Sequence, residues 1–320
     1  MRRMFVVVSV AGALASVERS AVAYCRTTTC QDTNGNSYTG HRCYNPTQPD
    51  DCGVEIGWRQ PCVSFDVQKD ASVQVDYTSA DLALKSAFAA WTGAACGAAS
   101  PSIQAYDFGS VDCTKVQYNY DNGEGNANIL IFRDKSWPHS KGSAQGSADI
   151  IALTTVTFDP VKGDIFDADI EVNSANFELT VTPSTTAIDL QSVLTHEAGH
   201  FLGLAHTQDT GATMYPDYSA GTVGKRTPDT DDVACICEAY PPDRTITEAC
   251  TGIPLHGWAS QCAGQQPNVS CEMAVGPAPH APFQGVWGLC AVTAVARALR
   301  RRSALQPGGC VKGRTARRRS

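Results

Sequence analysis

The chain has 320 residues, of which 42% are hydrophobic and 18% are charged, a balance typical of globular proteins rather than of disordered or fibrous ones. The formal net charge is −7, but residues 291–320 hold nine basic residues and no acidic ones. The remainder has sixteen basic residues against thirty-two acidic ones, a net charge of −16, which argues against nucleic-acid binding by the main domain.

The N-terminus has the three parts of a secretory signal. Arg2 and Arg3 precede an apolar run over residues 4–14 that is too short to span a bilayer, and the small residues 21–23 form an A-x-A cleavage site. We therefore expect residues 1–23 to be a signal peptide, Tyr24 to begin the mature chain, and the protein to be secreted and extracellular. The alternative is an ordinary hydrophobic strand.

All fourteen cysteines follow Ala23, which fits disulfide formation in an oxidising compartment. Residues 24–60 show little apolar periodicity and are interpreted as a cysteine-rich N-terminal extension held by disulfides. We expect a Cys96–Cys113 disulfide within the main domain. One or more further bridges are expected within the set Cys25, Cys30, Cys43, Cys52 and Cys62.

The middle of the chain predicts a strand, a helix, several strands and then two helices. Alternation of apolar and polar residues predicts a strand beginning at Cys62, and Ser79 or Asp81 can cap a helix that runs to about Trp91. Further strands are expected at 116–120, 128–132, 149–158 and 165–172. Asp189 can cap the next helix, and residues 227–229 can begin the last helix, after which the domain ends at residues 241–242.

A histidine motif lies on the first of these two helices. His196, Glu197, His200, Gly203 and His206 spell H-E-x-x-H-x-x-G-x-x-H. Residues four apart lie on one helix face, so two imidazoles can reach one metal ion while the glutamate lies beside it. Gly203 accepts positive φ, so the chain can turn there and return His206 as a third ligand. The alternative is an ordinary helix whose histidines are surface or core residues.

Three neutral imidazoles with one open position are typical of a catalytic zinc site, whereas structural zinc sites have four protein ligands. Together with Met214 in the segment 212–216, the motif resembles the metzincin metalloprotease signature with its Met-turn. The sequence of this segment is most similar to the matrixin branch, in its secreted bacterial form. The motif covers residues 196–216, and a weaker likeness extends over about 60–241.

The resemblance implies an α+β fold, in which a twisted mixed sheet packs on an active-site helix and a C-terminal helix. It assigns the catalytic domain to residues 61–242, between the cysteine-rich N-terminal extension (24–60) and a Pro/Gly/Cys-rich region with a basic tail (243–320). It also implies that residues 151–158 form the antiparallel edge strand that borders the substrate cleft, where an extended peptide can add to the sheet.

The resemblance assigns the site as well. His196, His200 and His206 are expected to hold one catalytic zinc ion, Glu197 to act as the general base, and Met214 to lie under the ligands as an apolar floor. Asp231 or Asp232 is expected to bond backbone near the Met-turn.

The chain departs from animal matrixins at the positions of their second, structural zinc. Thr155 and Ile170 stand in that area instead of histidines, so no structural zinc is predicted. The acidic run 164–171 and another around residues 121–124 have ligand types that suit calcium, but neither follows the EF-hand spacing, and we favour solvated acidic loops with calcium binding as the alternative. Cys52 lacks the flanking residues of a zinc-capping pro-segment and is interpreted as a disulfide cysteine.

These observations predict a secreted zinc-dependent endopeptidase that hydrolyses polypeptides, binds no nucleic acid and is a monomer. Two alternatives are a non-catalytic secreted or surface binding protein with a metzincin fold, and a zinc hydrolase acting on other substrates. The sequence of residues 243–320 does not indicate a particular fold, and no stable membrane span is expected there. A C-terminal surface anchor is an alternative reading of its cysteine, short apolar segment and arginines.

Overall fold

The computed structural model describes residues 24–29, 53–121, 123–139 and 149–262. The predicted signal peptide, the cysteines at positions 30, 43 and 52, and the tail from residue 263 lie outside the described residues. In chain order the elements are β1 (Cys25–Arg26), β2 (Cys62–Gln68), α1 (Tyr77–Thr92), β3 (Gln104–Val111), β4 (Ile129–Phe132), β5 (Ala152–Phe158), β6 (Ile165–Val172), β7 (Leu179–Thr180), β8 (Ile188–Asp189), α2 (Leu190–Phe201), β9 (Leu204–Ala205), the 3-10 helix η1 (Gly224–Arg226) and α3 (Thr230–Ala239).

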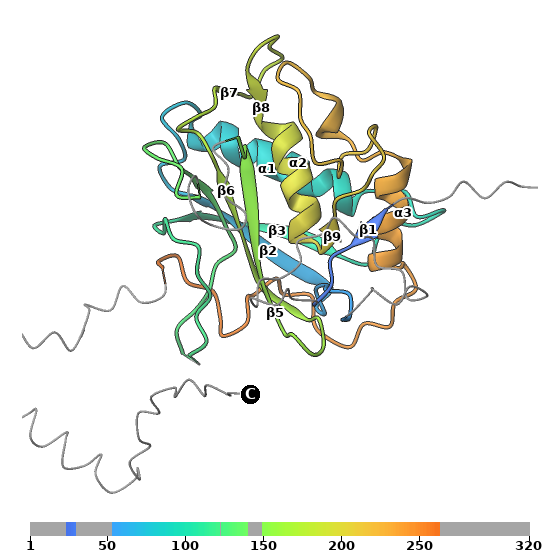
Figure 1. Ribbon diagram of the computed structural model, residues 1–320. Helices are drawn as coiled ribbons and strands as arrows, with labels where there is room; N and C mark the ends of the chain where they lie inside the picture. Colours follow the sequence, from blue (N-terminus) through green and yellow to red (C-terminus); the bar gives the residue numbers. More distant parts are fainter. Residues whose placement is uncertain (1–23, 30–52, 122, 140–148, 263–320) are drawn as a thin grey trace, which may run out of the picture. The chain divides into compact units, whose positions relative to one another are not determined.

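A five-stranded mixed sheet in the order β3-β2-β4-β6-β5 forms the centre of the fold (Figure 1). The first four strands are parallel to one another, and β5 pairs antiparallel with β6, from Ala152 opposite Val172 to Phe158 opposite Ile165. The α+β fold with a mixed sheet is confirmed. The strand predicted at the substrate cleft, β5, is the terminal strand of the described sheet.

The main core lies between one face of this sheet and the helices α1 and α2. Phe88 of α1 stacks on Phe65 of β2, with ring centroids 4.6 Å apart, and meets the edge of Phe201 at the end of α2 at 4.9 Å. Trp91 is fully buried, and its indole nitrogen donates to the Thr195 carbonyl of α2 at 2.7 Å. Aromatic packing and this hydrogen bond therefore fix α2, which carries the histidine motif, against α1.

The first helix begins earlier than the sequence predicted. Its N-cap is Asp76, whose carboxylate accepts from the Ser79 backbone at 3.0 Å, so neither Ser79 nor Asp81 is the cap. Asp81 lies inside the helix and forms an ion pair with Lys85, one turn further along, at 2.7 Å. Asp, Thr and Ser, which can all cap a helix, occur between residues 76 and 81, and the structure uses the first of them, Asp76. The sequence pattern alone does not distinguish between these candidates.

The strand predicted at residues 116–120 is not formed. Asn119 and Asn126 close this segment into a loop, because the Asn126 side chain accepts from the Asn119 backbone at 2.7 Å and donates to its carbonyl at 3.2 Å. The longest strand that the sequence did not predict is β3, which pairs along the whole length of β2. Its polar residues and Gly109 hide the alternation that marks a half-buried strand.

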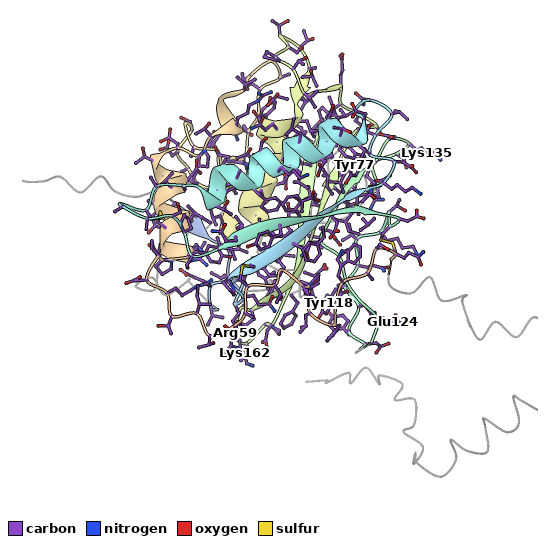
Figure 2. The ribbon with its side chains drawn as sticks, turned by 180° about the vertical axis from the view of Figure 1, so that it is seen from behind. Arg59, Tyr77, Tyr118, Glu124, Lys135 and Lys162 are labelled. Carbon is purple, nitrogen blue, oxygen red and sulfur yellow. A yellow bond between two sulfur atoms is a disulfide. The ribbon has the colours of Figure 1, made fainter. Side chains whose placement is uncertain are left out.

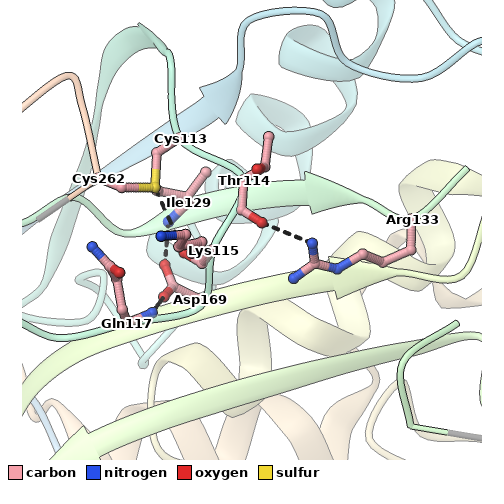
Figure 3. Close-up of a disulfide and its surroundings, with 8 residues drawn as sticks. All are labelled: Cys113, Thr114, Lys115, Gln117, Ile129, Arg133, Asp169 and Cys262. Atoms are coloured by element: carbon pink, nitrogen blue, oxygen red, sulfur yellow. Dashed lines mark hydrogen bonds between the residues drawn. A yellow bond between two sulfur atoms is a disulfide. The ribbon is translucent and has the colours of Figure 1, made fainter. Parts of the chain in front are cut away.

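The segment after α3 covers part of the opposite face of the sheet. Its residues reach the 112–126 region through backbone hydrogen bonds, from Asp112 to Ser260 and from Asn126 to Gly257. Two disulfides, Cys62–Cys250 and Cys113–Cys262, hold this segment in place, and Figure 3 shows the second beside β4 and β6. A second, smaller core lies here: Val111, Cys113, Ala127, Ile129, Ile131 and Cys262.

The view from behind in Figure 2 labels Tyr77 at the start of α1 and Tyr118 on the other side of β2. Tyr118 stacks on Phe166 of β6 at 5.9 Å and lies 5.9 Å from the ring of His256 in the covering segment.

Among the described residues, no helix combines the length and apolar character needed to cross a bilayer.

The predicted Cys96–Cys113 disulfide is wrong. Cys96 pairs with Cys237 of α3, and Cys113 pairs with Cys262. Cys62 pairs with Cys250 rather than with the N-terminal cysteines, while Cys25 is also disulfide-bonded. The partners come from segments distant in sequence, which cysteine spacing does not reveal.

The Cys96–Cys237 disulfide gives the first testable prediction. It joins residues 141 positions apart, so replacing both cysteines by alanine should lower the free energy of unfolding by about 2–5 kcal/mol. The matched control is Cys235→Ala on the same helix, since Cys235 is a free buried thiol and its removal should cost about 1 kcal/mol. Urea unfolding measures both variants, and equal losses would contradict the structural role of the disulfide.

The buried residue Asp66 gives the second testable prediction. Its carboxylate is fully buried on β2, with Oδ1 accepting from the Trp258 indole at 2.9 Å, and burial raises its pKa to about 7. Because the unfolded chain ionises near pH 3.9, the stability contributed by the protonated form is lost as the pH rises from about 4 to about 7.

Asp66→Asn removes this titration. The free energy of unfolding of the variant, relative to that of wild type at the same pH, should increase by about 2–3 kcal/mol from pH 5 to pH 8. The control is Asp70→Asn, which makes the same substitution in the exposed turn after β2. A difference for Asp66→Asn that does not depend on pH would contradict the prediction.

Candidate metal centre

The helix α2 begins at a charged anchor. Asp189 is its N-cap, as predicted, and accepts from the Ser192 backbone at 2.9 Å. The same carboxylate forms a bidentate pair with Arg226 of η1, at 2.8 and 2.5 Å. Although burial acts in the opposite direction, these hydrogen bonds hold the pKa of Asp189 below its ordinary value. The helix start and the segment after the Met-turn are therefore tied together.

His196 and His200 lie one turn apart on α2 and point their Nε2 atoms to the same place. The Nδ1 atom of each ring bonds a backbone carbonyl, Thr213 at 2.7 Å for His196 and Leu204 at 2.9 Å for His200. A ring nitrogen that donates to a carbonyl fixes the tautomer and leaves the other nitrogen free to bind a metal.

Gly203 turns the chain out of the helix, as the sequence predicted. Its φ is +87°, and a Cβ atom at this position would meet the Ile56 carbonyl oxygen at 2.6 Å, so the turn needs glycine for two reasons. The chain then forms β9 and delivers His206. Its Nε2 lies 3.1 Å from the Nε2 atoms of both His196 and His200.

Met214 lies under this cluster in a turn fixed by α3. Its side chain is 2% exposed, and a Cβ atom added to Gly199 would meet its Sδ at 2.3 Å, so the thioether packs directly against α2. The backbone N–H groups of Thr213 and Met214 donate to the carboxylate of Asp232, at 2.6 and 3.0 Å. Of the two aspartates named from the sequence, Asp232 bonds the Met-turn backbone, while Asp231 accepts from the Thr207 hydroxyl at 2.8 Å.

Glu197 is buried beside the histidines, with 6% of its surface exposed. Its Oε2 accepts from the hydroxyl of Thr154 on β5 at 2.7 Å. Burial raises the pKa of Glu197 to about 7, against the opposing effects of the Thr154 hydrogen bond and the Lys225 charge. The sequence did not single out Thr154 or Lys225, because neither occupies a motif position.

The donor set fits a zinc ion. Burial lowers the pKa of His200, and burial together with the neighbouring imidazoles lowers that of His196 well below its ordinary value, so both rings are neutral. With the Nδ1 hydrogens of His196 and His200 on carbonyls, the Nε2 lone pairs of both rings are directed at the Nε2 atom of His206, 3.1 Å away, where one cation could bind all three nitrogens. Tetrahedral zinc with bonds of about 2.0–2.1 Å holds two nitrogens about 3.3 Å apart. The three side chains could thus hold one metal ion.

Comparison with known families agrees with this geometry. The family model described as Matrixin matches residues 57–241, more than half of the chain. The chain belongs to the matrixin family. The relation to secreted bacterial members remains a prediction.

Curated proteins with similar segments are metalloendoproteinases and collagenases. Metalloendoproteinase 1 of Glycine max is 53% identical over 51 residues, which are 16% of this chain and 16% of that protein. Neutrophil collagenase of Homo sapiens is 27% identical over 183 residues, 57% of this chain and 33% of the collagenase. Interstitial collagenase of Bos taurus is 31% identical over 126 residues, 39% of this chain and 24% of that protein. The matched segments span a third or less of these relatives.

The acidic run of this matrixin is not a solvated loop, which corrects one expectation. Asp167, Asp169 and Glu171 are buried on β6. Asp169 accepts from the backbone N–H groups of Ile129 and Gln117, at 2.8 and 3.0 Å (Figure 3).

Glu171 has two cationic or polar neighbours, Arg133 at 2.5 Å and His139 at 2.8 Å. The carboxylate of Glu171 is therefore already bonded by protein side chains. Calcium binding at either acidic run remains a prediction.

The anchoring of the Met-turn is directly testable. Asp232 accepts from the backbone of Thr213, Met214 and Asp229, so Asp232→Ala leaves three N–H groups without their acceptor. We expect a loss of about 3 kcal/mol in the free energy of unfolding of the metal-free protein.

The matched control is Asp229→Ala at the N-cap of the same helix, which should cost about 1 kcal/mol. Chemical denaturation in the presence of a chelator measures both variants. If Asp229→Ala costs as much as Asp232→Ala, the carboxylate of Asp232 does not hold the Met-turn.

Proposed function

We propose that this chain is a secreted zinc-dependent endopeptidase that hydrolyses peptide bonds in polypeptide substrates. The observation that carries the proposal is the convergence of three imidazole Nε2 atoms beside a buried carboxylate. His196, His200 and His206 would hold one zinc ion, and Glu197 would act as the general base. Met214 would support the ligands from below without binding the metal.

Zinc held by these three histidines would supply Lewis acidity, which would polarise the scissile carbonyl and make water more acidic. Glu197 accepts a proton from the attacking water and then delivers it to the leaving amine. Its pKa near 7 suits both tasks, because a group that accepts and then donates a proton works best near the operating pH. The fixed Nδ1–carbonyl bonds keep the imidazoles of His196 and His200 in place during the reaction.

The substrate would bind along β5. This strand has no further partner in the described sheet, and all its residues are partly exposed. An extended peptide can therefore pair with its free backbone edge, which aligns the scissile bond with the adjacent α2 (Figure 1). This binding mode favours polypeptides over small esters.

Several wider properties belong to the same proposal. Residues 1–23 would be the signal peptide, and the disulfides of the described domain fit an oxidising, extracellular compartment. The catalytic domain would be residues 61–242, between the extensions 24–60 and 243–320. We propose a monomer that binds no nucleic acid, with C-terminal surface anchoring as the alternative to free release.

The test separates metal binding from catalysis. Glu197→Ala should retain one zinc ion per chain and lose casein cleavage by at least about 10²-fold, because the proton-transfer group is removed while the ligands remain. His206→Ala should lose both zinc and cleavage. Metal analysis and kcat/KM on casein are measured for both variants and wild type.

Unchanged cleavage by Glu197→Ala would contradict the general-base role. Zinc in wild type without cleavage of casein, gelatin or small esters would favour a non-catalytic binding protein. Cleavage of esters alone would instead favour a zinc hydrolase with another substrate class.

A further inference from the structure

The hydroxyl of Thr154 connects the edge strand to the candidate catalytic carboxylate. Its Oγ1 lies 2.7 Å from Oε2 of Glu197 and 3.2 Å from the backbone carbonyl oxygen of the same residue. A threonine hydroxyl has a single hydrogen, and the shorter contact shows that it is directed at the carboxylate, with the carbonyl oxygen as a second, longer contact. One side chain of β5 thus contacts both the side chain and the backbone of Glu197.

The sheet fixes the direction of this hydroxyl. Thr154 is paired with Ile170 of β6, which belongs to the core under α2, whereas Thr155 is paired with the buried Asp169 on the other face. Successive side chains of a strand point to opposite faces, so Thr154 points toward α2 and Thr155 points away from it. Threonine is also restricted at χ1 because it is β-branched. The donor is therefore held by the strand and does not depend on a mobile side chain.

We propose that Thr154 is a positioning residue for Glu197: its hydroxyl holds Oε2 and leaves Oε1 directed at the water that attacks the substrate. The inference rests on the proposed role of Glu197 as general base. A carboxylate buried to this extent needs a donor in order to keep one orientation, and Thr154 supplies it from the strand that would bind the substrate. A single strand, β5, would therefore both position the general base and supply the backbone edge that binds the substrate.

The test compares three variants at two positions. Thr154→Val keeps the shape but removes the donor, and it should lower kcat by at least about tenfold with KM and zinc content unchanged. Thr154→Ser keeps the donor and should stay within about threefold of wild type. Thr92→Val makes the same substitution at the end of α1, outside the candidate site and the substrate strand, and should leave kcat unchanged.

A second readout needs no catalysis. In the metal-free protein, Thr154→Val should lower the urea midpoint in the wild-type background and have a smaller effect in the Glu197→Ala background, because the hydrogen bond to the carboxylate is already absent there. Thr154→Ala is measured alongside, so that a packing defect peculiar to valine is recognised by its absence in the alanine variant.

Two results overturn the inference. One is a Thr154→Val enzyme with wild-type kcat, and the other is a loss of kcat that Thr154→Ser shares in full. In both cases, if the Glu197→Ala variant is inactive, the proposed function still holds and only the role of Thr154 is refuted. If Glu197→Ala is itself fully active, the general-base proposal fails, and the inference about Thr154 fails with it.

Discussion

The site depends on three hydrogen-bonded imidazoles whose free nitrogens are forced to face one another. Two of the rings bond backbone carbonyls through Nδ1, and the third is delivered by the turn at Gly203, where the chain has φ +87° and no room for a Cβ atom. The Nε2 atom of His206 consequently lies 3.1 Å from the Nε2 atoms of both His196 and His200. One metal ion between the three nitrogens would bind all of them, so the local backbone geometry prepares a metal site.

Carboxylates at the starts of two helices connect the histidine site to the rest of the domain. Asp189 caps α2 and pairs with Arg226, while Asp232 lies in the first turn of α3 and accepts from the Met-turn backbone. Both anchors join a helix start to the segment 213–226, which follows the histidine motif in the chain. The Cys96–Cys237 disulfide ties α3 to the loop after α1 in turn. The metal ligands, the Met-turn and the last helix therefore form one connected unit.

The sequence predicted the site better than its surroundings, for a physical reason. The histidine spacing, the Asp189 cap and the turn at Gly203 are decided by residues within about one turn of one another, and the structure agrees with all three. The strand expected at 116–120 failed because a side-chain pair, Asn119 with Asn126, takes the backbone hydrogen bonds that a strand would need. Disulfide partners and the contact from Thr154 to Glu197 join distant segments, so no local pattern indicates them.

The most direct test of this account is the coordination of zinc in the purified protein by X-ray absorption spectroscopy. The account predicts three imidazole nitrogens at about 2.0–2.1 Å with a fourth, oxygen ligand and no sulfur in the wild type, and loss of the zinc from His206→Ala. Four protein ligands, a sulfur at about 2.3 Å, or an unchanged spectrum in His206→Ala would contradict a three-histidine centre with an open position.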